Sequence, residues 1–214
     1  MLGSMGATGA ATEARGREGT RAAILDAALD CFSRYGYRRT SMEELARAAG
    51  LSRAAVYLYF KSKGEVFRAL SERLHDRQLA EAQDAAEGSE PLDERLALVL
   101  EAKLRTVVEV VYASPHGADL LDENSRLCGD ISLAARRRFT SILGSLVADA
   151  TARGELDPQR AGLSPAAAAE LIADISRGLE LGAESLTPAN HRRRLRQAAR
   201  VLIAGLGGRL GDSG

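Results

Sequence analysis

Between residues 40 and 63 the chain concentrates side chains that donate hydrogen bonds of the kind found on phosphate oxygens and base edges. An arginine can bind guanine through two parallel hydrogen bonds, whereas hydroxyl groups and lysine suit phosphate oxygens. Arg53 is suited to the paired contact, and the small side chains of Ala54 and Ala55 leave room for close approach or for contact with a thymine methyl group. The candidate contact residues are Thr40, Ser41, Ser52, Arg53, Ala55, Tyr57, Tyr59 and Lys63.

Several of these side chains have a second interpretation that the sequence leaves open. Tyr57 could be mostly a core residue, with its ring packed on the preceding helix, and Tyr59 could be an ordinary surface residue. Lys63 could simply be solvated, and Arg53 could contact phosphate instead of a base. The residue types therefore favour nucleic-acid binding without assigning each contact.

Two short helices joined by a tight turn would position these residues. Ser41-Met42-Glu43-Glu44 has the pattern of a capping box, which begins a helix. Gly50 ends that helix and permits the backbone geometry that a steep crossing requires. Ser52 caps the second helix, whose short length would let its first turn enter a major groove. With a preceding helix over about 20–35, the pattern predicts a helix-turn-helix.

The charge distribution agrees with this prediction. The whole chain has no net charge at pH 7, but the charges are unevenly placed. From Arg15 to Arg68 there are eleven basic and six acidic residues, so this segment carries +5 and the remainder carries −5. A basic segment on an acidic body is typical of a DNA-binding module joined to another domain.

The apolar spacing is helical along the whole chain, and the composition is poor in strand-forming residues. The predicted fold class is therefore all-α, with about nine helices. We expect helices over about 20–35, 42–49, 53–60, 62–87, 92–113, 116–124, 127–153, 164–184 and 188–205.

Other classes of protein find little support. No apolar run is long enough to span a membrane, and no signal-peptide core is present, so we expect a cytoplasmic protein. Cys31 and Cys128 fit buried residues in a reducing compartment. The three histidines are isolated, and no metal-binding, nucleotide-binding or nucleophile motif occurs, so we expect no catalytic residue, metal or cofactor. A protein-binding module would need an apolar outer face on the second short helix, which Arg53 and Tyr57 do not provide.

The sequence resembles the TetR family of transcriptional regulators over about residues 20–70. The matching segments are Ala27-Ala28-Leu29 through Phe32, Tyr35-Gly36-Tyr37, Thr40-Ser41-Met42-Glu43-Glu44-Leu45-Ala46, Ala49-Gly50-Leu51-Ser52 and Val56-Tyr57-Leu58-Tyr59-Phe60-Lys61-Ser62-Lys63. The resemblance implies a dimer that binds a palindromic operator on double-stranded DNA, most often as a repressor. It also implies base contacts from Ser52, Arg53 and Ala55, and phosphate contacts from Thr40, Tyr57, Tyr59 and Lys63. The chain departs from the family at Ala54-Ala55, where Gly-Thr is common, so the lost hydroxyl puts the specific operator in doubt.

The resemblance further implies how the rest of the chain is organised. We expect a disordered arm over 1–19, a DNA-binding domain over 20–66, a ligand-binding and dimerisation domain over 67–206 and a flexible tail over 207–214. The helices over 164–184 and 188–205 would form a homodimer, and an unknown small molecule would release the DNA. The candidate ligand-binding residues are polar or aromatic residues within apolar helical stretches: Arg105, Glu109, Tyr112, His116, Asp122, Asn124, Phe139 and Arg177.

Overall fold

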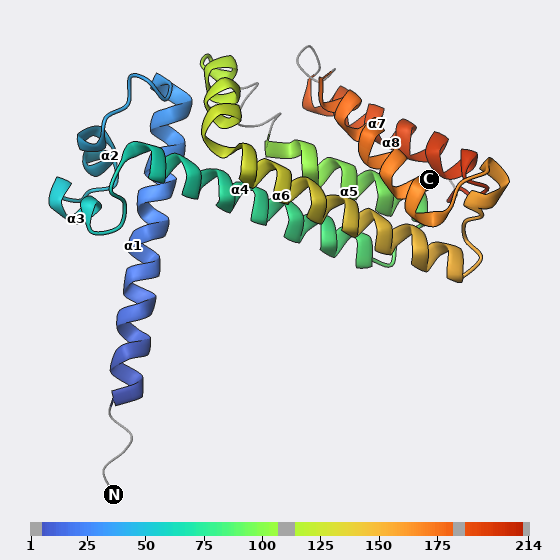
Figure 1. The fold of residues 1–214 in the computed structure, drawn as a ribbon, viewed down its shortest axis with the longest axis horizontal. Helices are drawn as coiled ribbons and strands as arrows, with labels where there is room; N and C mark the ends of the chain where they lie inside the picture. The colour runs from blue at the N-terminus through green and yellow to red at the C-terminus, as the bar shows by residue number, and fades with distance from the viewer. Residues whose placement is uncertain (1–5, 107–113, 182–186, 212–214) are drawn as a thin grey trace, which may run out of the picture. The chain divides into compact units, whose positions relative to one another are not determined.

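The computed structural model describes residues 6–106, 114–181 and 187–211, and its α-helices confirm the predicted all-α class (Figure 1). The helices within these ranges are α1 (Gly6–Tyr35), α2 (Met42–Ala48), α3 (Arg53–Tyr57), α4 (Lys63–Glu87), α5 (Leu92–Thr106), α6 (Gly117–Ala152), the 3₁₀ helix η2 (Pro158–Ala161), α7 (Pro165–Leu181) and α8 (Pro188–Gly205). The helices expected over 164–184 and 188–205 are thus α7 and α8. Both helices begin with a side-chain cap, because Ser164 Oγ accepts from Ala167 N at 3.2 Å and Thr187 Oγ1 accepts from Asn190 N at 3.3 Å.

Two of the expected helices form a single element. The helices predicted over 116–124 and 127–153 are joined as α6, which is interrupted by non-helical backbone at Cys128, with φ −128° and ψ 19°. The predicted break is therefore a kink within one continuous segment. The helix was expected to end near residue 124, but the chain continues through residues 122–126 in helical geometry.

The first helix begins earlier than the sequence suggested. We expected a disordered arm over 1–19, whereas α1 is helical from Gly6 onward. Residues 15–19 are all exposed, so local preference and not burial forms this part of the helix. Alanine, glutamate and arginine are strong helix formers, and over several residues their preference outweighs the interspersed glycines.

The described residues divide into two compact units. The N-terminal unit comprises residues 6–72 and 114–129, and the C-terminal unit comprises 73–106, 130–181 and 187–211. The predicted boundary near residue 66 therefore missed the start of α6. That segment belongs to the N-terminal unit because Ser114 Oγ donates to Ser33 O at 2.7 Å and Ser71 Oγ donates to Asn124 Oδ1 at 2.9 Å.

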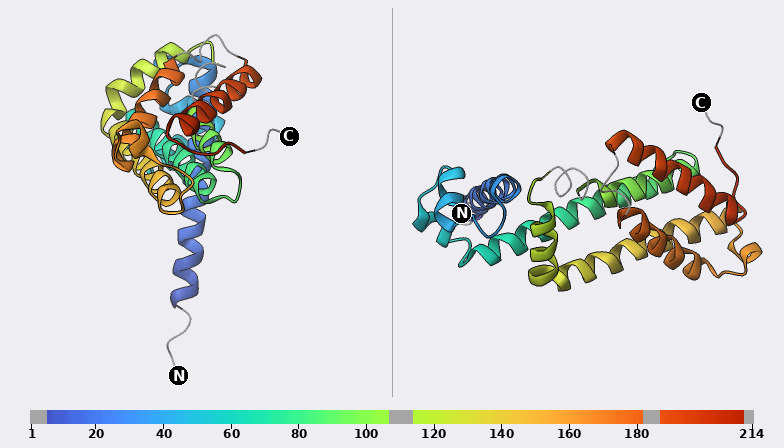
Figure 2. Two further views of the ribbon diagram at one scale, coloured as in Figure 1. Left: turned by 90° about the vertical axis from the view of Figure 1, so that its right-hand side faces the viewer. Right: turned by 90° about the horizontal axis from the view of Figure 1, so that it is seen from above.

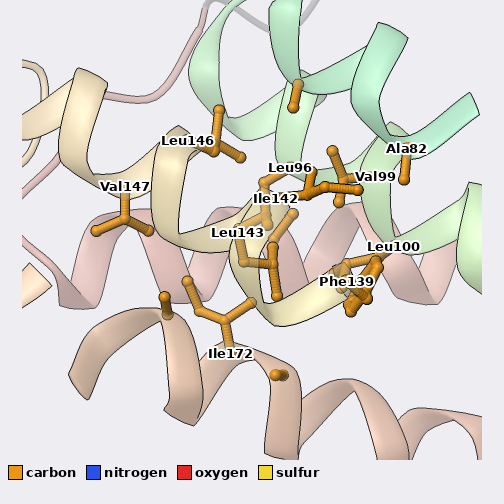
Figure 3. Packing of buried hydrophobic residues seen from close by; sticks show 14 of the residues in the cluster. Ala82, Leu96, Val99, Leu100, Phe139, Ile142, Leu143, Leu146, Val147 and Ile172 are labelled. Carbon is orange, nitrogen blue, oxygen red and sulfur yellow. The ribbon is translucent and has the colours of Figure 1, made fainter. Parts of the chain in front are cut away.

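The core of the C-terminal unit lies between α4, α5, α6, α7 and α8. Leu100, Leu143 and Ile172 are almost completely buried, and Figure 3 shows side chains of this cluster from α5, α6 and α7 pointing toward one another. On α8, Leu195 and Ile203 are buried in the same cluster. The helices α5 and α8 pack side by side (Figure 2), so the apolar face of α8 is largely used within the chain.

The end of the chain is bonded to α5 as far as it is described. We expected residues 207–214 to be flexible, but Gly211 N donates to Asp93 Oδ1 at 3.1 Å. Arg200 joins the same carboxylate, with its Nη1 3.1 Å from Asp93 Oδ2. The carboxylate is buried, and it satisfies one backbone donor and one guanidinium at the first turn of α5.

One buried histidine interrupts the apolar face of α8. His191 is 5% exposed, and neither ring nitrogen has a hydrogen-bond partner among the described residues. Burial lowers the pKa of the imidazole, and the charge of Arg194 lowers it further, so the neutral form is favoured in the folded chain.

We expect His191→Leu to raise the free energy of unfolding by about 1 kcal/mol at pH 7.5, because it removes two buried polar atoms that lack partners. In the wild type the lowered pKa makes stability fall as pH drops below the unfolded-state value of about 6.5, because only the unfolded chain readily takes the proton. The variant should lose part of this dependence, and the lowered pKa of His75 should retain the rest. Urea unfolding between pH 5 and 8 measures both effects.

The matched control is Asn190→Leu, at an exposed neighbouring position, which should leave both quantities close to wild type. A less stable His191→Leu protein would contradict the prediction.

Candidate nucleic-acid interface

The local geometry of the helix-turn-helix agrees with the sequence pattern. Ser41 Oγ accepts from Glu44 N at 3.2 Å while Glu44 Oε2 accepts from Ser41 N at 2.7 Å, which completes the capping box. These hydrogen bonds also lower the pKa of Glu44. Gly50 adopts φ 68°, a left-handed conformation that favours glycine. Ser52 Oγ accepts from Ala55 N at 3.1 Å and so caps α3.

Burial holds the two short helices in place. Leu45 of α2 and Val56 of α3 are completely buried, and α2 packs against both α1 and α3. A helix as short as α3 is not stable alone in water, so this packing is what maintains its orientation. The outward residues of α3 are therefore presented on a fixed surface.

Arg53 and Tyr57 form the exposed surface of α3. The guanidinium carbon of Arg53 lies 5.6 Å from the centre of the Tyr57 ring, a distance that allows a cation–π contact. Tyr57 is 40% exposed, which argues against the alternative that it is mainly a core residue. Ala55 and Tyr59 are half-buried beside them, and Ser52 is exposed at the first turn.

A second arginine lies near Arg53 that the sequence analysis did not select. Arg47, in the last turn of α2, lines a surface hollow of about 410 Å³ together with Glu43, Ala46, Leu51 and Arg53. Both arginines are exposed, so two guanidinium groups border one hollow between α2 and α3. The position of Arg47 on the polar face of the helix, four residues after Glu43, was the signal that could have identified it.

Two predicted phosphate contacts have other partners in the structure. Thr40 is 2% exposed, and its hydroxyl donates to Gly36 O at 2.8 Å. Lys63 Nζ donates to Tyr37 O at 2.7 Å and to Arg38 O at 3.3 Å, and it lies 4.3 Å from the centre of the Tyr37 ring. Both side chains therefore fix the loop between α1 and α2. For this reason we do not propose Thr40 and Lys63 as DNA contacts.

A buried carboxylate of α6 contacts the same loop between α1 and α2. Glu123 Oε2 lies 2.7 Å from Arg126 Nη2, and Glu123 Oε1 lies 3.5 Å from Arg38 Nε. Burial would raise the pKa of Glu123, but the hydrogen bonds and charges of Arg126 and Arg38 outweigh it and lower the pKa, so the carboxylate is ionised. We call Lys63, the carbonyl groups of Tyr37 and Arg38, and Glu123 the loop clamp.

The predicted ligand-binding residues are divided between the two units. His116, Asp122 and Asn124 lie in the N-terminal unit, where Asn124 bonds with Ser71. The residues that lie in the C-terminal unit are Arg105, Phe139 and Arg177. The remaining two, Glu109 and Tyr112, lie outside the described residues.

Of the three in the C-terminal unit, two are engaged in ion pairs. Arg105 pairs with Glu81, and Arg177 pairs with Asp174 on the same helix. Phe139 is 4% exposed and belongs to the apolar cluster (Figure 3).

A polar group within the C-terminal unit was missed by the sequence analysis. Lys103 Nζ lies 3.0 Å from Ser176 Oγ, 3.5 Å from Glu180 Oε2 and 5.2 Å from the centre of the Phe139 ring. We call Lys103, Ser176 and Glu180 the Lys103 cluster. A weak signal was available, because Lys103 is one of only three lysines in an arginine-rich chain.

Other kinds of site find no support in the part of the chain that the structure describes. It contains no group of three or more histidine, cysteine or acidic side chains placed to hold a metal ion. None of its helices combines the length and apolar character needed to cross a membrane. Cys31 and Cys128 are both buried thiols, and burial raises the pKa of Cys31.

Comparisons with known proteins identify relatives of this chain. The family described as "Bacterial regulatory proteins, tetR family" matches residues 24–70. The chain is 30% identical over 155 residues to the HTH-type transcriptional regulator TtgR of Pseudomonas putida, covering 68% of this chain and 74% of TtgR.

Solved structures of similar fold include regulators of the same family. SmeT, the repressor of the Stenotrophomonas maltophilia multidrug efflux pump SmeDEF, is 25% identical with a TM-score of 0.61, covering 86% of this chain and 88% of SmeT. A SmeT–triclosan complex is 25% identical with a TM-score of 0.62, covering 87% of this chain and 90% of that chain.

Removal of the ammonium from the loop clamp should destabilise the N-terminal unit. We expect Lys63→Met to lower the free energy of unfolding by about 2 kcal/mol, because it leaves a part-buried carbonyl of Tyr37 without its charged donor. Lys61→Met is the matched control at an exposed position, and it should change stability by less than about 0.5 kcal/mol. Equal urea midpoints for the two variants would show that Lys63 is only a surface charge.

Proposed function

The chain belongs to the TetR family of bacterial transcriptional regulators, and from this premise we propose that its dimer binds a palindromic operator through α3 and represses transcription. Binding of a small molecule to the C-terminal unit would release the DNA. The observation that carries the proposal is the exposed, capped first turn of α3, with Ser52, Arg53 and Tyr57 on its surface. The protein would act by binding and not by catalysis, in the cytoplasm where its operator is found.

Each residue of this surface has a role that its position supports. Arg53 would form the bidentate contact with guanine, because it lies at the entering end of the helix and has an exposed guanidinium. Ala55 would allow close approach, and Tyr57 and Tyr59 would direct hydroxyl groups to phosphate oxygens. Ser41 and Ser52 accept hydrogen bonds in their caps and keep their hydroxyl protons for donation to phosphate.

Arg47 would add a phosphate contact on the adjacent helix. It faces the same hollow as Arg53 but belongs to α2, which crosses the DNA backbone in helix-turn-helix complexes. An arginine on phosphate strengthens binding to every sequence, whereas an arginine on a base edge distinguishes sequences. The two arginines therefore offer a direct test of the proposed orientation.

Dimerisation is proposed through the exposed faces of α7 and α8. After the chain's own core has taken Ile172, Leu195 and Ile203, apolar side chains remain on the outside of both helices. Val201 is 71% exposed and Leu171 is 44% exposed. A second copy of the chain would cover them through a symmetric interface, which also matches the two-fold symmetry of a palindromic operator.

Release by a small molecule is proposed from the family and from a relative. SmeT has been solved with triclosan, and this chain shares the fold of SmeT over most of its length. A ligand would act by favouring dimers in which the two recognition helices no longer match half-sites about one helical turn, ~34–36 Å, apart.

The DNA-binding proposal predicts different effects for the two arginines. Selection from a randomised duplex pool should enrich one palindrome. On that sequence, Arg53→Ala should weaken binding by about tenfold and should relax the preference at one position in each half-site. Arg47→Ala should instead weaken binding to all duplexes alike and reduce the slope of affinity against salt by about one. The same pattern of losses from both variants would refute the proposed orientation.

The dimer proposal predicts that a charge on the exposed face of α8 separates the subunits. We expect Val201→Glu to sediment as a monomer at micromolar concentration while it retains its helical circular dichroism. Leu133→Glu is the control, because Leu133 is 45% exposed but lies on α6. A Val201→Glu protein that remains dimeric would exclude this face as the interface.

A further inference from the structure

We propose that the C-terminal unit binds amphipathic molecules that carry an acid group, and that this group replaces Glu180 as the counter-ion of Lys103. The inference rests on the proposed function, because it names the chemical class of the small molecule that would release the DNA. It is carried by the geometry of the Lys103 cluster, which brings side chains of α5 and α7 together beside Phe139 of α6.

Lys103 is a cation held among apolar residues. Its side chain is 19% exposed, and the neighbouring leucines of the helix, Leu100 and Leu104, are almost completely buried. Removing an ammonium from water is costly unless hydrogen bonds and an opposite charge compensate. Burial accordingly lowers the pKa of Lys103, while Glu180 raises it and so supports the charged form.

Among the residues that the structure describes, this compensation is partial. Ser176, which is completely buried, accepts from Nζ at 3.0 Å and donates its own proton to Ala173 O at 2.7 Å. The charged partner is more distant, since Glu180 Oε2 lies 3.5 Å from Nζ and charge-assisted hydrogen bonds are ~2.7–2.9 Å long. Glu180 is also 33% exposed, so it keeps contact with water.

The charges around the cluster favour an added anion over an added cation. The positive charges of Arg177 and Arg136 both lower the pKa of Lys103. Asp174 pairs with Arg177 and offsets one of these charges. A cationic ligand would meet the repulsion of Lys103 and Arg136, whereas an acid group would gain from both.

Buried apolar side chains lie beside the ammonium. The Phe139 ring is centred 5.2 Å from Nζ, and Ile142 and Leu143 lie further along the same helix, α6, in the buried cluster (Figure 3). These side chains are buried in the core, so we propose that an aromatic or aliphatic body displaces part of this packing while its acid group reaches Lys103. The chemistry of the site therefore fits a weak acid on an apolar body and fits a neutral polar molecule less well.

A matched pair of probes tests the charge preference. Isothermal titration of the whole 214-residue chain would compare naphthalene-2-carboxylate with naphthalene-2-carboxamide, which share one ring system and differ in charge. We expect the acid to bind about tenfold more tightly than the amide, equivalent to about 1.4 kcal/mol. Equal affinities, or no binding of either probe at millimolar concentration, would overturn the proposal.

Two variants test the exchange of counter-ions. Lys103→Met keeps the apolar stem and should abolish the preference for the acid. Glu180→Gln removes the competing carboxylate and should tighten binding of the acid about tenfold with little effect on the amide, which keeps the test decisive if Lys103→Met does not fold. Weaker acid binding by Glu180→Gln would contradict the exchange. The matched controls Glu170→Gln and Lys61→Met, at exposed positions, should bind both probes as the wild type does.

The test of acid binding can fail or succeed independently of the test of DNA binding. Titration of the probes needs no DNA, and selection of an operator needs no ligand. A protein that selects a palindrome but does not distinguish the probes overturns only the acid-binding inference. A protein that prefers the acid but selects no duplex overturns the DNA-binding proposal and leaves the chemistry of the site in place.

Discussion

The hydrogen bonds from Lys63 to the carbonyl groups of Tyr37 and Arg38 are the interaction on which the DNA-binding geometry depends. They fix the loop between α1 and α2 to the first residue of α4. Thr40 is buried at the end of that loop, directly before the capping box that begins α2. Because α3 has only five residues, its direction is set by α2 and by burial of Val56, and therefore by this loop.

Helices α4 and α6 each run through both units, and α6 carries residues near both proposed sites. Helix α4 begins with Lys63 of the loop clamp and continues without interruption to Glu87 of the C-terminal unit. Helix α6 contributes Glu123 to the loop clamp and Phe139 to the surroundings of Lys103, with the kink at Cys128 between them. A change of partners in the Lys103 cluster would therefore act on elements that also hold the loop, which is the physical basis we propose for coupling ligand to DNA.

The sequence predicted those features that depend on neighbouring residues. The capping box at Ser41, the turn at Gly50 and the cap at Ser52 each involve atoms within a few positions, and all are present. The roles of Thr40 and Lys63 could not be predicted, because a hydroxyl or an ammonium can point to solvent or to a carbonyl and only the folded loop decides. Lys103 was missed for a related reason, since its partners Ser176 and Glu180 are more than seventy residues away. Likewise, the boundary near residue 66 failed because residues 114–129 pack on a segment distant in sequence.

The central claim is that two N-terminal units of a dimer engage one operator together. Pulsed electron resonance on Ala23→Cys protein tests it, because Ala23 is exposed on α1 whereas Cys31 and Cys128 are buried from the spin label. We expect the distribution of distances between the two labels to narrow to a single distance when the selected palindrome binds. If no interaction between two labels is detected, or if the palindrome does not change the distribution of distances, the joint binding of one operator by two N-terminal units is contradicted.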